Sequence, residues 1–392
     1  MRILIVLTYY RPHTSGLTIY AERLAKALVK RGHLVTVMTS QFERNLPGEE
    51  TVDGVHIVRV PVLFRLSKGV IMPTFGMMAN RLVAQHDVVH LHLPQFDAAG
   101  VALRGRLVRK PTVVTYHCDL KMPSGALSQL ANRAILLMNE LAAIFTHRMV
   151  TYTKDYAENS QYLRRYTKKL RVISPPVELP EVTQEEIDHF KNKNNPDGRH
   201  PIIGMSARFA SEKGVEVLLD ALPAILRDYP QAQVQFAGAY EHIMGEEDYF
   251  KRLIPRINAY EESGNWKFLG NLSSKQIACY YPNLDVLVLP SLNSTESFGL
   301  VQIEAMINGV PCVTSNLPGV RQPVIRHGMG KIFSIGESLG LSEAVIEVLK
   351  NGSAFQKDSE SIRQEYRPDR IAQIYEELFN EIRQDLGHKQ SD

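Results

Sequence analysis

Short apolar runs alternate with longer amphipathic stretches along most of this 392-residue chain. Five apolar runs in the first half predict strands, at residues 3–10, 34–40, 55–62, 87–94 and 111–117. Five more in the second half predict strands at residues 202–206, 232–238, 266–270, 285–290 and 311–315. The intervening stretches repeat apolar positions at helical spacing. This alternation indicates α/β structure with parallel sheets, and its occurrence in both halves indicates two Rossmann-like domains.

Prolines and a polar stretch mark the connection between the halves. Pro175, Pro176 and Pro180 stiffen the chain, and residues 191–201 are rich in Asn, Lys, Gly and Pro. The region 133–165 reads as helical, and residues 367–386 predict a long charged helix. We therefore expect an N-terminal domain at residues 1–180, a C-terminal domain at residues 181–365, and a C-terminal helix and tail at residues 366–392. We expect ligands in a cleft between the domains, beyond the carboxyl ends of the strands.

The segment at residues 294–311 carries two carboxylates, Glu296 and Glu304, around a predicted helix start. The amides of residues 297–300 would point out of that helix start, which is a favourable place for a phosphate group. Glu304 would lie about 9 Å further along the helix axis. Two readings stay open at this point, because acids near helix starts are also favoured by the dipole and a pair of carboxylates also suits a glycosidase.

Two cations follow the first predicted strand of the second half. Arg208 and Lys213 are five positions apart, and a helix is predicted to begin directly after them. An arginine can bind a diphosphate with two parallel hydrogen bonds and a lysine as a point charge, and both can stabilise it as it leaves. The alternative is a solvated turn with two surface cations.

Two loops of the first half hold further candidates. The loop at residues 8–20 contains one glycine, Gly16, instead of the G-x-G-x-x-G of a dinucleotide site, which argues against a dehydrogenase. Gly16 would either permit a tight turn or let a ligand approach the backbone. His117 and Asp119 follow a predicted strand, where His117 could contact a sugar hydroxyl or could be a buried histidine bonded to a backbone carbonyl.

Charge is distributed unevenly along the chain. Residues 1–180 hold 24 Lys and Arg against 12 Asp and Glu, whereas the remainder holds 21 against 30. The basic half favours an anionic partner such as a membrane surface. Residues 60–82 and 121–138 mix apolar and basic side chains and could face an interface, although core packing is the alternative. No aromatic-interleaved basic motif favours nucleic acid.

Cysteine spacing and hydropathy suggest a compartment. Cys118, Cys279 and Cys312 stand far apart, so a disulfide framework or zinc site is not expected and a reducing cytoplasm fits. No run reaches the roughly 18 uninterrupted apolar residues of a membrane span. We therefore expect a cytoplasmic protein that could lie on the inner face of a membrane.

The segment at residues 294–311 resembles the signature of the retaining glycosyltransferases of family 4, which have the GT-B fold; Glu296, Phe298, Gly299, Leu300 and Glu304 carry the match. The resemblance extends over most of the chain. It implies transfer of a hexose or N-acetylhexosamine from a nucleotide diphosphate sugar to the hydroxyl of a sugar, lipid-linked or small-molecule acceptor. Cell-surface polysaccharide, glycolipid or related glycoconjugate synthesis would be the setting. It also implies that the C-terminal helix crosses back to the N-terminal domain.

The resemblance also assigns residue roles. It implies that Glu296 lies beside the transferred sugar, that Glu304 holds the ribose hydroxyls, and that Arg208 and Lys213 neutralise the diphosphate. The implied catalytic residues are Glu296, His117, Arg208 and Lys213, and the implied donor-binding residues are Gly16, Arg208, Lys213, Gly238, Asn271, Leu272, Ser297, Phe298, Gly299, Leu300 and Glu304.

The chain departs from the family pattern in two places. Ser15 stands where the family often has a second glycine, and Gln322 stands where relatives often carry a glutamate. No Asp-x-Asp pair occurs in the sequence, so we expect neither a metal nor another cofactor to be needed. The alternatives are a non-catalytic glycosyltransferase-like partner protein and a nucleotide sugar epimerase of the same fold.

The uneven charge generates a prediction about membranes. We expect the protein to bind anionic liposomes through its N-terminal half, and to lose that binding as salt rises, because the attraction is screened. Co-sedimentation with vesicles at increasing sodium chloride measures this. Equal binding to neutral and anionic vesicles would contradict the membrane interpretation of the basic half.

Overall fold

The computed structural model describes residues 1–66, 69–119 and 126–388, and the chain divides into two compact units. The first unit comprises Met1–Pro176 together with Tyr366–Asp392. The second comprises Val177–Glu365. Each unit contains its own sheet and its own hydrophobic core.

The first unit is built on an eight-stranded sheet with the order β10-β9-β8-β7-β1-β2-β4-β3. Its strands are β1 (Arg2–Val6), β2 (Leu34–Gln41), β3 (Glu49–Val52), β4 (Val55–Pro61), β7 (Val88–Leu93), β8 (Thr112–Tyr116), β9 (Arg148–Thr151) and β10 (Leu170–Val172). All neighbours are parallel except β3, which runs antiparallel to β4 at the edge. Strands β5 (Phe64–Leu66) and β6 (Gly69–Ile71) pair separately.

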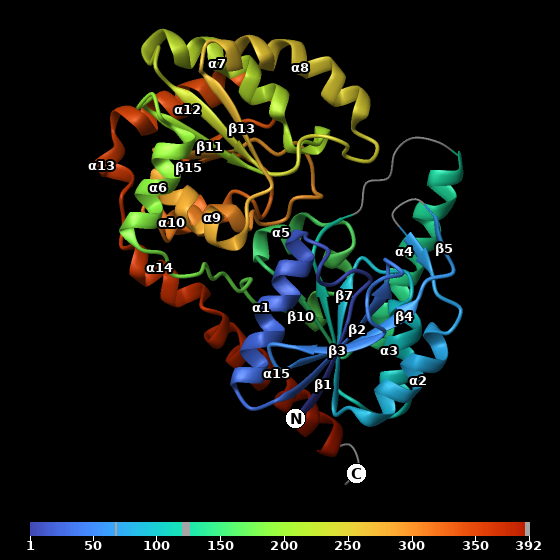
Figure 1. The fold of residues 1–392 in the computed structure, drawn as a ribbon. Helices are drawn as coiled ribbons and strands as arrows, with labels where there is room; N and C mark the ends of the chain where they lie inside the picture. Colours follow the sequence, from blue (N-terminus) through green and yellow to red (C-terminus); the bar gives the residue numbers. More distant parts are fainter. Residues whose placement is uncertain (67–68, 120–125, 389–392) are drawn as a thin grey trace. The chain divides into compact units, whose positions relative to one another are not determined.

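Helices cover both faces of this sheet, as Figure 1 shows. On one face lie α2 (Phe75–Gln85), α3 (Ala98–Leu107) and α4 (Ala126–Phe145), and on the other lie α1 (Gly16–Lys30) and α15 (Pro368–His388). Short turns of helix connect the last strands, at α5 (Lys154–Asn159), η1 (Leu163–Arg165) and η2 (Thr167–Lys169). Burial of apolar strand residues against both helical layers supplies the main driving force for folding.

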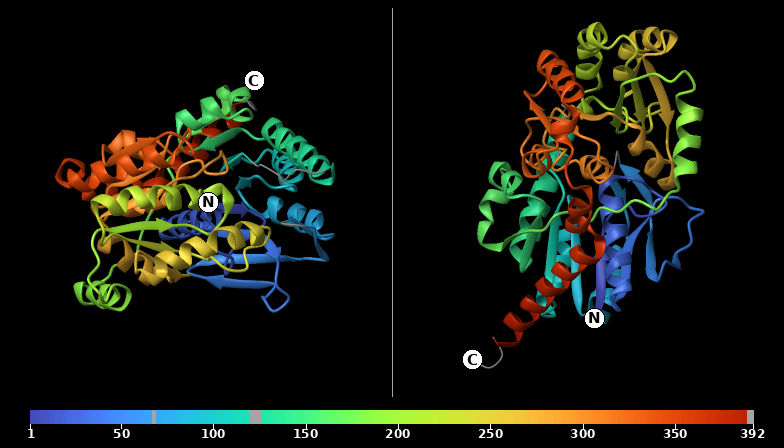
Figure 2. Two further views of the ribbon diagram at one scale, coloured as in Figure 1. Left: turned by 90° about the horizontal axis from the view of Figure 1, so that it is seen from above. Right: turned by 90° about the vertical axis from the view of Figure 1, so that its left-hand side faces the viewer.

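The C-terminal helix α15 is part of the first unit, as the family resemblance implies. It runs beside α1, which the right-hand view of Figure 2 shows in red and blue. The hydroxyl of Tyr375 is fully buried and lies 2.6 Å from the hydroxyl of Tyr20 and 2.7 Å from Oγ1 of Thr115. Arg31, the residue directly after α1, pairs with Glu376 at 2.9 Å. Helix α15 therefore completes the unit through both buried and surface contacts.

The second unit has a six-stranded sheet, entirely parallel, with the order β13-β12-β11-β14-β15-β16. Its strands are β11 (Ile202–Ser206), β12 (Gln233–Ala237), β13 (Trp266–Gly270), β14 (Val286–Leu289), β15 (Cys312–Ser315) and β16 (Gly330–Phe333). Its helices are α6 (Gln184–Asn194), η3 (Ser211–Lys213), α7 (Val215–Asp228), α8 (Glu247–Glu262), α9 (Ser274–Tyr280), η4 (Tyr281–Asn283), α10 (Leu300–Met306), α11 (Gln322–His327), α12 (Ser338–Lys350), α13 (Gly352–Phe355) and α14 (Ser359–Tyr366).

The structure corrects some sequence-based expectations. The region 133–165 is not one helical stretch, because strand β9 interrupts it between α4 and α5. The polar segment 191–201 is not all linker, since α6 extends through Asn194. Strands β3 and β16 and the β5–β6 pair were not predicted. Their sequences are short or polar, so their strand conformation depends on neighbouring strands more than on their own pattern.

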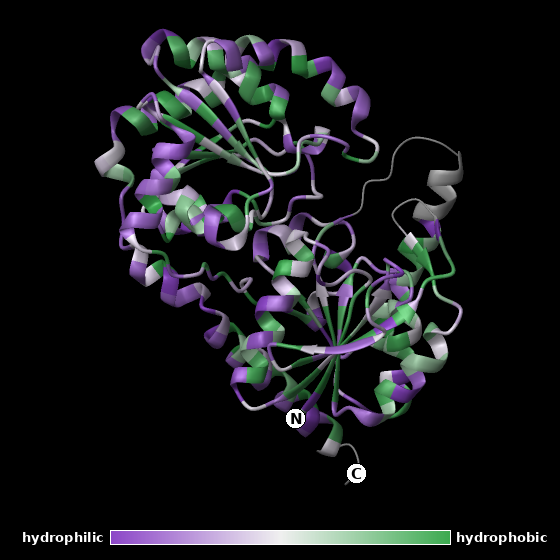
Figure 3. Cartoon of the chain, viewed as in Figure 1, coloured by the Kyte–Doolittle hydropathy of each residue, from purple (hydrophilic) through white to green (hydrophobic). Residues whose placement is uncertain are grey.

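Hydropathy follows the layers of each unit. In Figure 3 the strands are largely green and the outward faces of many helices are purple. Among the described residues, no helix combines the length and the apolar character needed to cross a membrane. The segment 121–138 suggested by the sequence as an interface begins outside the described residues, and only its part from residue 126 onward is seen as helix α4.

The buried hydroxyl contact of α15 generates a stability prediction. We expect Tyr375→Phe to lower the free energy of unfolding by about 1–3 kcal/mol, because the hydroxyls of Tyr20 and Thr115 each lose a buried partner. Urea denaturation followed by far-UV circular dichroism measures the change. Tyr260→Phe is the control, since the hydroxyl of this half-buried tyrosine has no hydrogen-bond partner among the described residues. An unchanged denaturation midpoint in Tyr375→Phe would contradict the assigned role.

Candidate active site

The candidate residues of the second unit all follow the carboxyl ends of its parallel strands. Arg208 and Lys213 follow β11, Gly238 follows β12, and Asn271 and Leu272 follow β13. The acidic segment at residues 294–300 follows β14. Because the strands are parallel, these loops meet at one edge of the sheet.

Lys213 and Glu296 form the central contact of this edge. Nζ of Lys213 lies 2.7 Å from Oε2 of Glu296, and each side chain is about four-fifths buried. The other carboxylate oxygen of Glu296 accepts the backbone N–H of Gly299 at 3.0 Å. A charged ammonium and a backbone amide therefore converge on one carboxylate. The expected presentation of free amides at this helix start does not hold for Gly299, whose N–H is already donated to Glu296.

Arg208 has a carboxylate partner of its own. Its guanidinium forms an ion pair with Glu212, whose side chain is only 15% exposed. Burial alone would raise the pKa of Glu212, but the charge of Arg208 and hydrogen bonds outweigh it and lower that pKa. The carbonyl of Glu212 also accepts the N–H of Leu292 at 2.9 Å, which joins the loop after β11 to the loop after β14. Both candidate cations are thus neutralised by acids of their own unit.

Glu304 lies on the buried side of helix α10. It is 7% exposed, and its Oε2 accepts the hydroxyl of Tyr281 at 2.8 Å. Burial, followed by the negative charge of Glu304, raises the pKa of Tyr281 well above its usual range. The tyrosine therefore remains a hydrogen-bond donor at any physiological pH and fixes the carboxylate of Glu304 in one orientation.

The start of α10 is held by its own backbone and by a buried amide. Gly299 adopts a left-handed conformation with φ of 79°. Gln302 is fully buried, and its Nε2 donates to the carbonyls of Phe298 and Val320, both at 2.9 Å. Ser297 and Phe298 are also buried. The loop that carries Glu296 is therefore fixed from beneath.

Gly238 has a structural reason to be glycine. Its φ is 142°, and a Cβ built on it would lie 2.0 Å from the carbonyl oxygen of Ala207. Its N–H donates to the carbonyl of Gly270 at 2.8 Å, so the loops after β11, β12 and β13 touch through their backbones. Asn271 is exposed and Leu272 half-buried beside this contact. Gln322, where relatives often carry a glutamate, begins helix α11.

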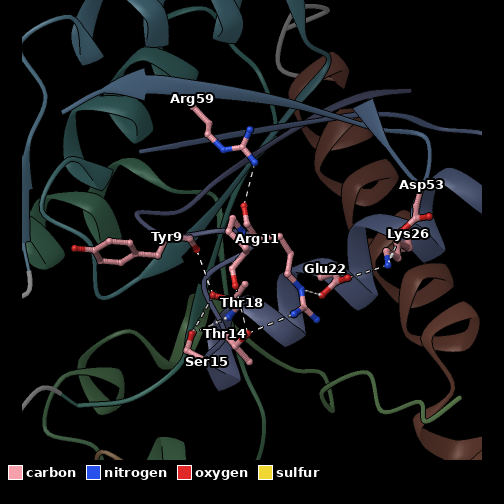
Figure 4. Close-up of polar contacts among 10 residues, drawn as sticks. Tyr9, Arg11, Thr14, Ser15, Thr18, Glu22, Lys26, Asp53 and Arg59 are labelled. Atoms are coloured by element: carbon pink, nitrogen blue, oxygen red, sulfur yellow. Dashed lines mark hydrogen bonds and ion pairs between the residues drawn. The ribbon is translucent and has the colours of Figure 1, made fainter. Parts of the chain in front are cut away.

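Gly16 begins helix α1 in the first unit, and the loop before it is held on several sides (Figure 4). Arg59, a buried residue of β4, donates to the carbonyl of Arg11 at 3.0 Å. Arg11 forms an ion pair with Glu22 of α1. Ser15 caps the helix, since its side chain accepts the N–H of Thr18 at 3.2 Å.

Gly16 itself needs no glycine for conformational reasons. A Cβ built on Gly16 meets no atom within 4 Å, and its φ is outside the left-handed region. The tight-turn explanation for this glycine is therefore wrong. Its lack of a side chain leaves open space beside the first turn of α1.

His117 lies in a buried polar cluster of the first unit. Its Nε2 lies 2.8 Å from Nδ1 of His92, and its Nδ1 is hydrogen bonded to the hydroxyl of Tyr152. Burial, followed by the neighbouring His92, holds the pKa of His117 well below its usual range, and burial lowers the pKa of His92 to about 3. Both histidines are therefore neutral at physiological pH. Each ring nitrogen of His117 thus has a side-chain partner, whereas the buried-histidine alternative expected a backbone carbonyl.

Asp119 follows His117 and is anchored by two hydroxyls. Its Oδ1 accepts the hydroxyl of Tyr116 at 2.8 Å and that of Ser160 at 2.9 Å, while its N–H donates to the hydroxyl of Tyr156 at 2.7 Å. These contacts bring helix α5 against the end of β8. Asp119 thus fixes the loop after His117.

Some residues of the site were missed by sequence reasoning. Glu212, Tyr281 and Gln302 hold Arg208, Glu304 and the loop of Glu296 in place. Glu212 lies between the two predicted cations, so its charge and its spacing of four from Arg208 could have revealed it. Nothing in the sequence around Tyr281 or Gln302 indicates a partner more than 15 residues away.

Two units with largely parallel sheets, and charged loops at the carboxyl edge of the second, place the chain among the α/β proteins of the doubly wound class. Comparison with known proteins makes the class specific. The model of the glycosyl transferases group 1 matches residues 186–367, and that of glycosyltransferase family 4 matches residues 14–180.

Relatives and solved structures agree with these matches. An uncharacterized glycosyltransferase of Methanocaldococcus jannaschii is 28% identical over 344 residues, covering 85% of each chain. A phosphatidyl-myo-inositol mannosyltransferase of Mycobacterium tuberculosis is 26% identical over 90% of this chain and 88% of its own. The structure of HepE from Anabaena in complex with UDP superposes with a TM-score of 0.73 at 19% identity, over 97% of this chain and 100% of the other.

The chain belongs to the group 1 glycosyltransferases and has the GT-B fold. Glycosyl transfer is its activity class. This confirms the family and the fold expected from residues 294–311, whereas the roles assigned to individual residues remain predictions.

The open space at Gly16 generates a prediction. We expect Gly16→Ala to leave the melting temperature unchanged or slightly higher, because alanine favours a helix and meets no atom there. If a ligand approaches this turn, the same change lowers glycosyl transfer at least 5-fold. Gly238→Ala is the structural comparison and is expected to cost about 1–3 kcal/mol of stability. Full transfer activity in Gly16→Ala would contradict ligand approach.

Proposed function

We propose that this protein is a retaining, metal-independent glycosyltransferase that moves a hexose or N-acetylhexosamine from a nucleotide diphosphate sugar to an acceptor hydroxyl. The loops at the carboxyl edge of the second unit bind the donor. Arg208 and Lys213 bind the diphosphate, Glu304 holds the ribose hydroxyls, and Glu296 lies beside the sugar.

One observation carries this proposal: the Lys213 ammonium and the Gly299 amide converge on the carboxylate of Glu296. Two donors aimed at one pair of oxygens are arranged for an oxyanion, and a diphosphate offers the same type of acceptor with more charge. Donor binding then exchanges the carboxylate of Glu296 for phosphate oxygens at Lys213. Arg208 makes a similar exchange from Glu212.

Related proteins support the donor class. HepE, which shares the fold, has been crystallised with UDP and with UDP-glucose. The mycobacterial relative is named as a mannosyltransferase. Glucose and mannose are both hexoses, which supports a hexose donor here. The carboxylate of Glu304 is already oriented by Tyr281, so it can accept hydrogen bonds from a ribose without reorganising.

The proposed chemistry is a front-face substitution at the anomeric carbon. The acceptor oxygen attacks that carbon as the bond from the carbon to the phosphate oxygen breaks, and the departing phosphate takes the proton of the acceptor hydroxyl. Arg208 and Lys213 stabilise the charge that develops on the diphosphate, so no metal is required. His117, neutral in its buried cluster, donates or accepts a hydrogen bond to a sugar hydroxyl if its ring exchanges one of its present partners.

In this proposal the basic first unit binds the acceptor. Its sequence favours a lipid-linked or otherwise anionic acceptor, and several apolar side chains of the region 60–82 are exposed, including Leu63, Phe64 and Met77 at 66%, 51% and 72%. Apolar side chains among cations favour contact with the boundary of an anionic bilayer. This supports a peripheral position on a membrane, with the sugar added to a polysaccharide or glycolipid precursor.

The proposed exchange of the Glu296 carboxylate for phosphate at Lys213 generates a prediction. Removing the charge of Glu296 should strengthen nucleotide binding and weaken turnover. We expect Glu296→Gln to bind nucleoside diphosphate at least 3-fold more tightly, because the competing charge at Lys213 is removed, while turnover falls at least 100-fold. Lys213→Ala is expected to weaken nucleoside diphosphate binding and to lower turnover. Glu304→Ala is expected to weaken donor binding. Calorimetry with UDP, ADP and GDP, and hydrolysis of their glucose, mannose and N-acetylglucosamine derivatives, measure these effects.

The controls separate the site from general loss of charge. Glu347→Gln removes a comparable carboxylate that pairs with Lys331 on the surface, and we expect it to behave as wild type. EDTA is expected to leave turnover unchanged. Wild-type donor affinity in Glu304→Ala would overturn the ribose assignment, and a protein that binds no nucleoside diphosphate and turns over no donor would be a non-catalytic relative.

A further inference from the structure

A basic cavity lies in the first unit, at the edge of the sheet opposite the loop of His117 and Asp119. Its volume is about 440 Å³, and it is lined by the end of α3, the loop between α4 and β9, Lys169 and the last turns of α15. His147 and Arg148 stand at the start of β9, whereas His117 follows the carboxyl end of β8. Since β8 has five residues at about 3.3 Å each, the two edges are separated by roughly 15 Å.

Positive charge dominates the wall of this cavity. Arg106, Arg109, Arg148 and Lys169 line it with a single carboxylate, Asp385. Arg148 pairs with that carboxylate, since its Nη2 lies 3.0 Å from Oδ2 of Asp385, and the same Nη2 lies 2.9 Å from Oε1 of Glu381 beside the cavity. The excess of positive charge therefore comes from Arg106, Arg109 and Lys169. Arg106 and Arg109 are exposed, and neither has a carboxylate partner among the described residues. The cavity therefore holds an excess of cations whose charge the described chain leaves uncompensated.

Lys169 adds a positive charge that does not depend on an acid. Its ammonium donates to the carbonyls of Ala143, Ile144 and Thr146, at 2.8, 2.9 and 2.9 Å. These are the last carbonyls of helix α4 and the residue that follows it. Lys169 is thus locked in place as a helix cap, and its charge acts on the cavity at short range.

Two N–H donors beside these cations lack an acceptor. Nδ1 of His147 accepts the backbone N–H of Thr112 at 3.1 Å, so the proton of the neutral ring is on Nε2. That Nε2 and the Nε of Arg148 are buried, and neither has a hydrogen-bond partner among the described residues. Buried donors without acceptors are uncommon and call for an explanation such as a bound ion.

The pKa of His147 also reflects the positive charges around the cavity. Burial, followed by the charges of Arg106, Lys169 and Arg148, lowers its pKa to about 4. At neutral pH the ring is therefore an uncharged donor. An anion in the cavity would offset the neighbouring cations and raise this pKa, which makes His147 a local probe.

We propose that this cavity binds the phosphoryl group of an anionic ligand. The planar guanidinium groups of Arg106 and Arg109 can each bind two oxygens of a phosphate, and small rotations of His147 and Arg148 bring their N–H donors toward it. A volume of about 440 Å³ accommodates a phosphate with a small organic group attached. This site is distinct from the donor loops, which belong to the second unit.

The position of the cavity indicates what such a ligand would do. Ile382, Asp385 and Leu386 of α15 form part of its wall, and the remaining wall comes from the sheet edge and α3. A phosphate held there joins α15 to the body of the first unit. Ligand binding therefore stabilises the docked state of the C-terminal helix.

The phosphoryl group has two possible sources with the same chemistry. It could belong to a free phosphorylated metabolite or to the headgroup of an anionic lipid. Leu107, Val108 and Ile144 are exposed at 72%, 48% and 54% and adjoin lining residues in the sequence, which would suit a lipid. The experiment therefore has one arm in solution and one on vesicles.

The solution arm follows the ring of His147 by NMR while inorganic phosphate is added, with sodium chloride at equal ionic strength as the reference. It is carried out in the Lys213→Ala background, so that phosphate at the donor loops does not contribute. We expect saturable shifts of the His147 ring and a pKa at least 0.5 higher with phosphate. Arg106→Gln combined with Arg109→Gln is expected to weaken this binding at least 10-fold.

The control is Arg133→Gln combined with Arg383→Gln, which removes the same charge from exposed positions outside the cavity. The vesicle arm compares phosphatidylglycerol with phosphatidylcholine vesicles for wild type and both double variants. Saturable phosphate binding that depends on Arg106 and Arg109 supports a free ligand. If only the binding to phosphatidylglycerol vesicles depends on these two arginines, the ligand is a lipid headgroup. Chloride that reproduces the His147 shifts, or equal binding by the two double variants in both arms, would overturn the proposal.

Discussion

In a parallel sheet, the loops that follow the strands all lie at the same edge. The candidate site depends on that constraint. In the second unit the loops after β11 and β14 meet through the N–H of Leu292 and the carbonyl of Glu212. That backbone contact brings Lys213 to within 2.7 Å of Glu296, although 83 residues separate them in the chain. The sheet topology therefore determines which loops meet at this edge. The local sequence determines only which charged residues those loops carry.

The charges at this edge are balanced before any ligand binds. Each candidate cation has a carboxylate of its own unit, Glu212 for Arg208 and Glu296 for Lys213. Such pairing avoids leaving half-buried cations without compensation, which would cost stability. In the proposed function, donor binding would then be an exchange of partners instead of the filling of an empty charged site. Affinity for a diphosphate would be a difference between two similar interactions, which favours release of the product.

Sequence reasoning recovered the architecture because the core strands are short, apolar and separated by amphipathic helices, a pattern that survives in a single sequence. It failed where conformation depends on distant neighbours. The sequence pattern placed strand β9 inside a predicted helical region, because four residues are too few to show a strand periodicity. Pairing with β8 and β10 determines its strand conformation. The Glu296 carboxylate and the Lys213 ammonium were each predicted, but their direct contact was not. Tyr281, which orients Glu304, could not have been found, since only the fold brings the two together.

The order of segments along the chain has a consequence for how the protein is made. The first unit is split between Met1–Pro176 and the segment from Tyr366 onward, whereas the second unit is one continuous stretch of 189 residues from Val177 to Glu365. At about 5–20 residues per second, a ribosome needs roughly 10–40 s to translate that stretch. During this interval the second unit can fold, while the face of the first sheet that receives α15 stays uncovered, with Tyr20 and Thr115 lacking the hydroxyl of Tyr375. The face of the first unit that packs against α15 is therefore buried only after that helix has been translated.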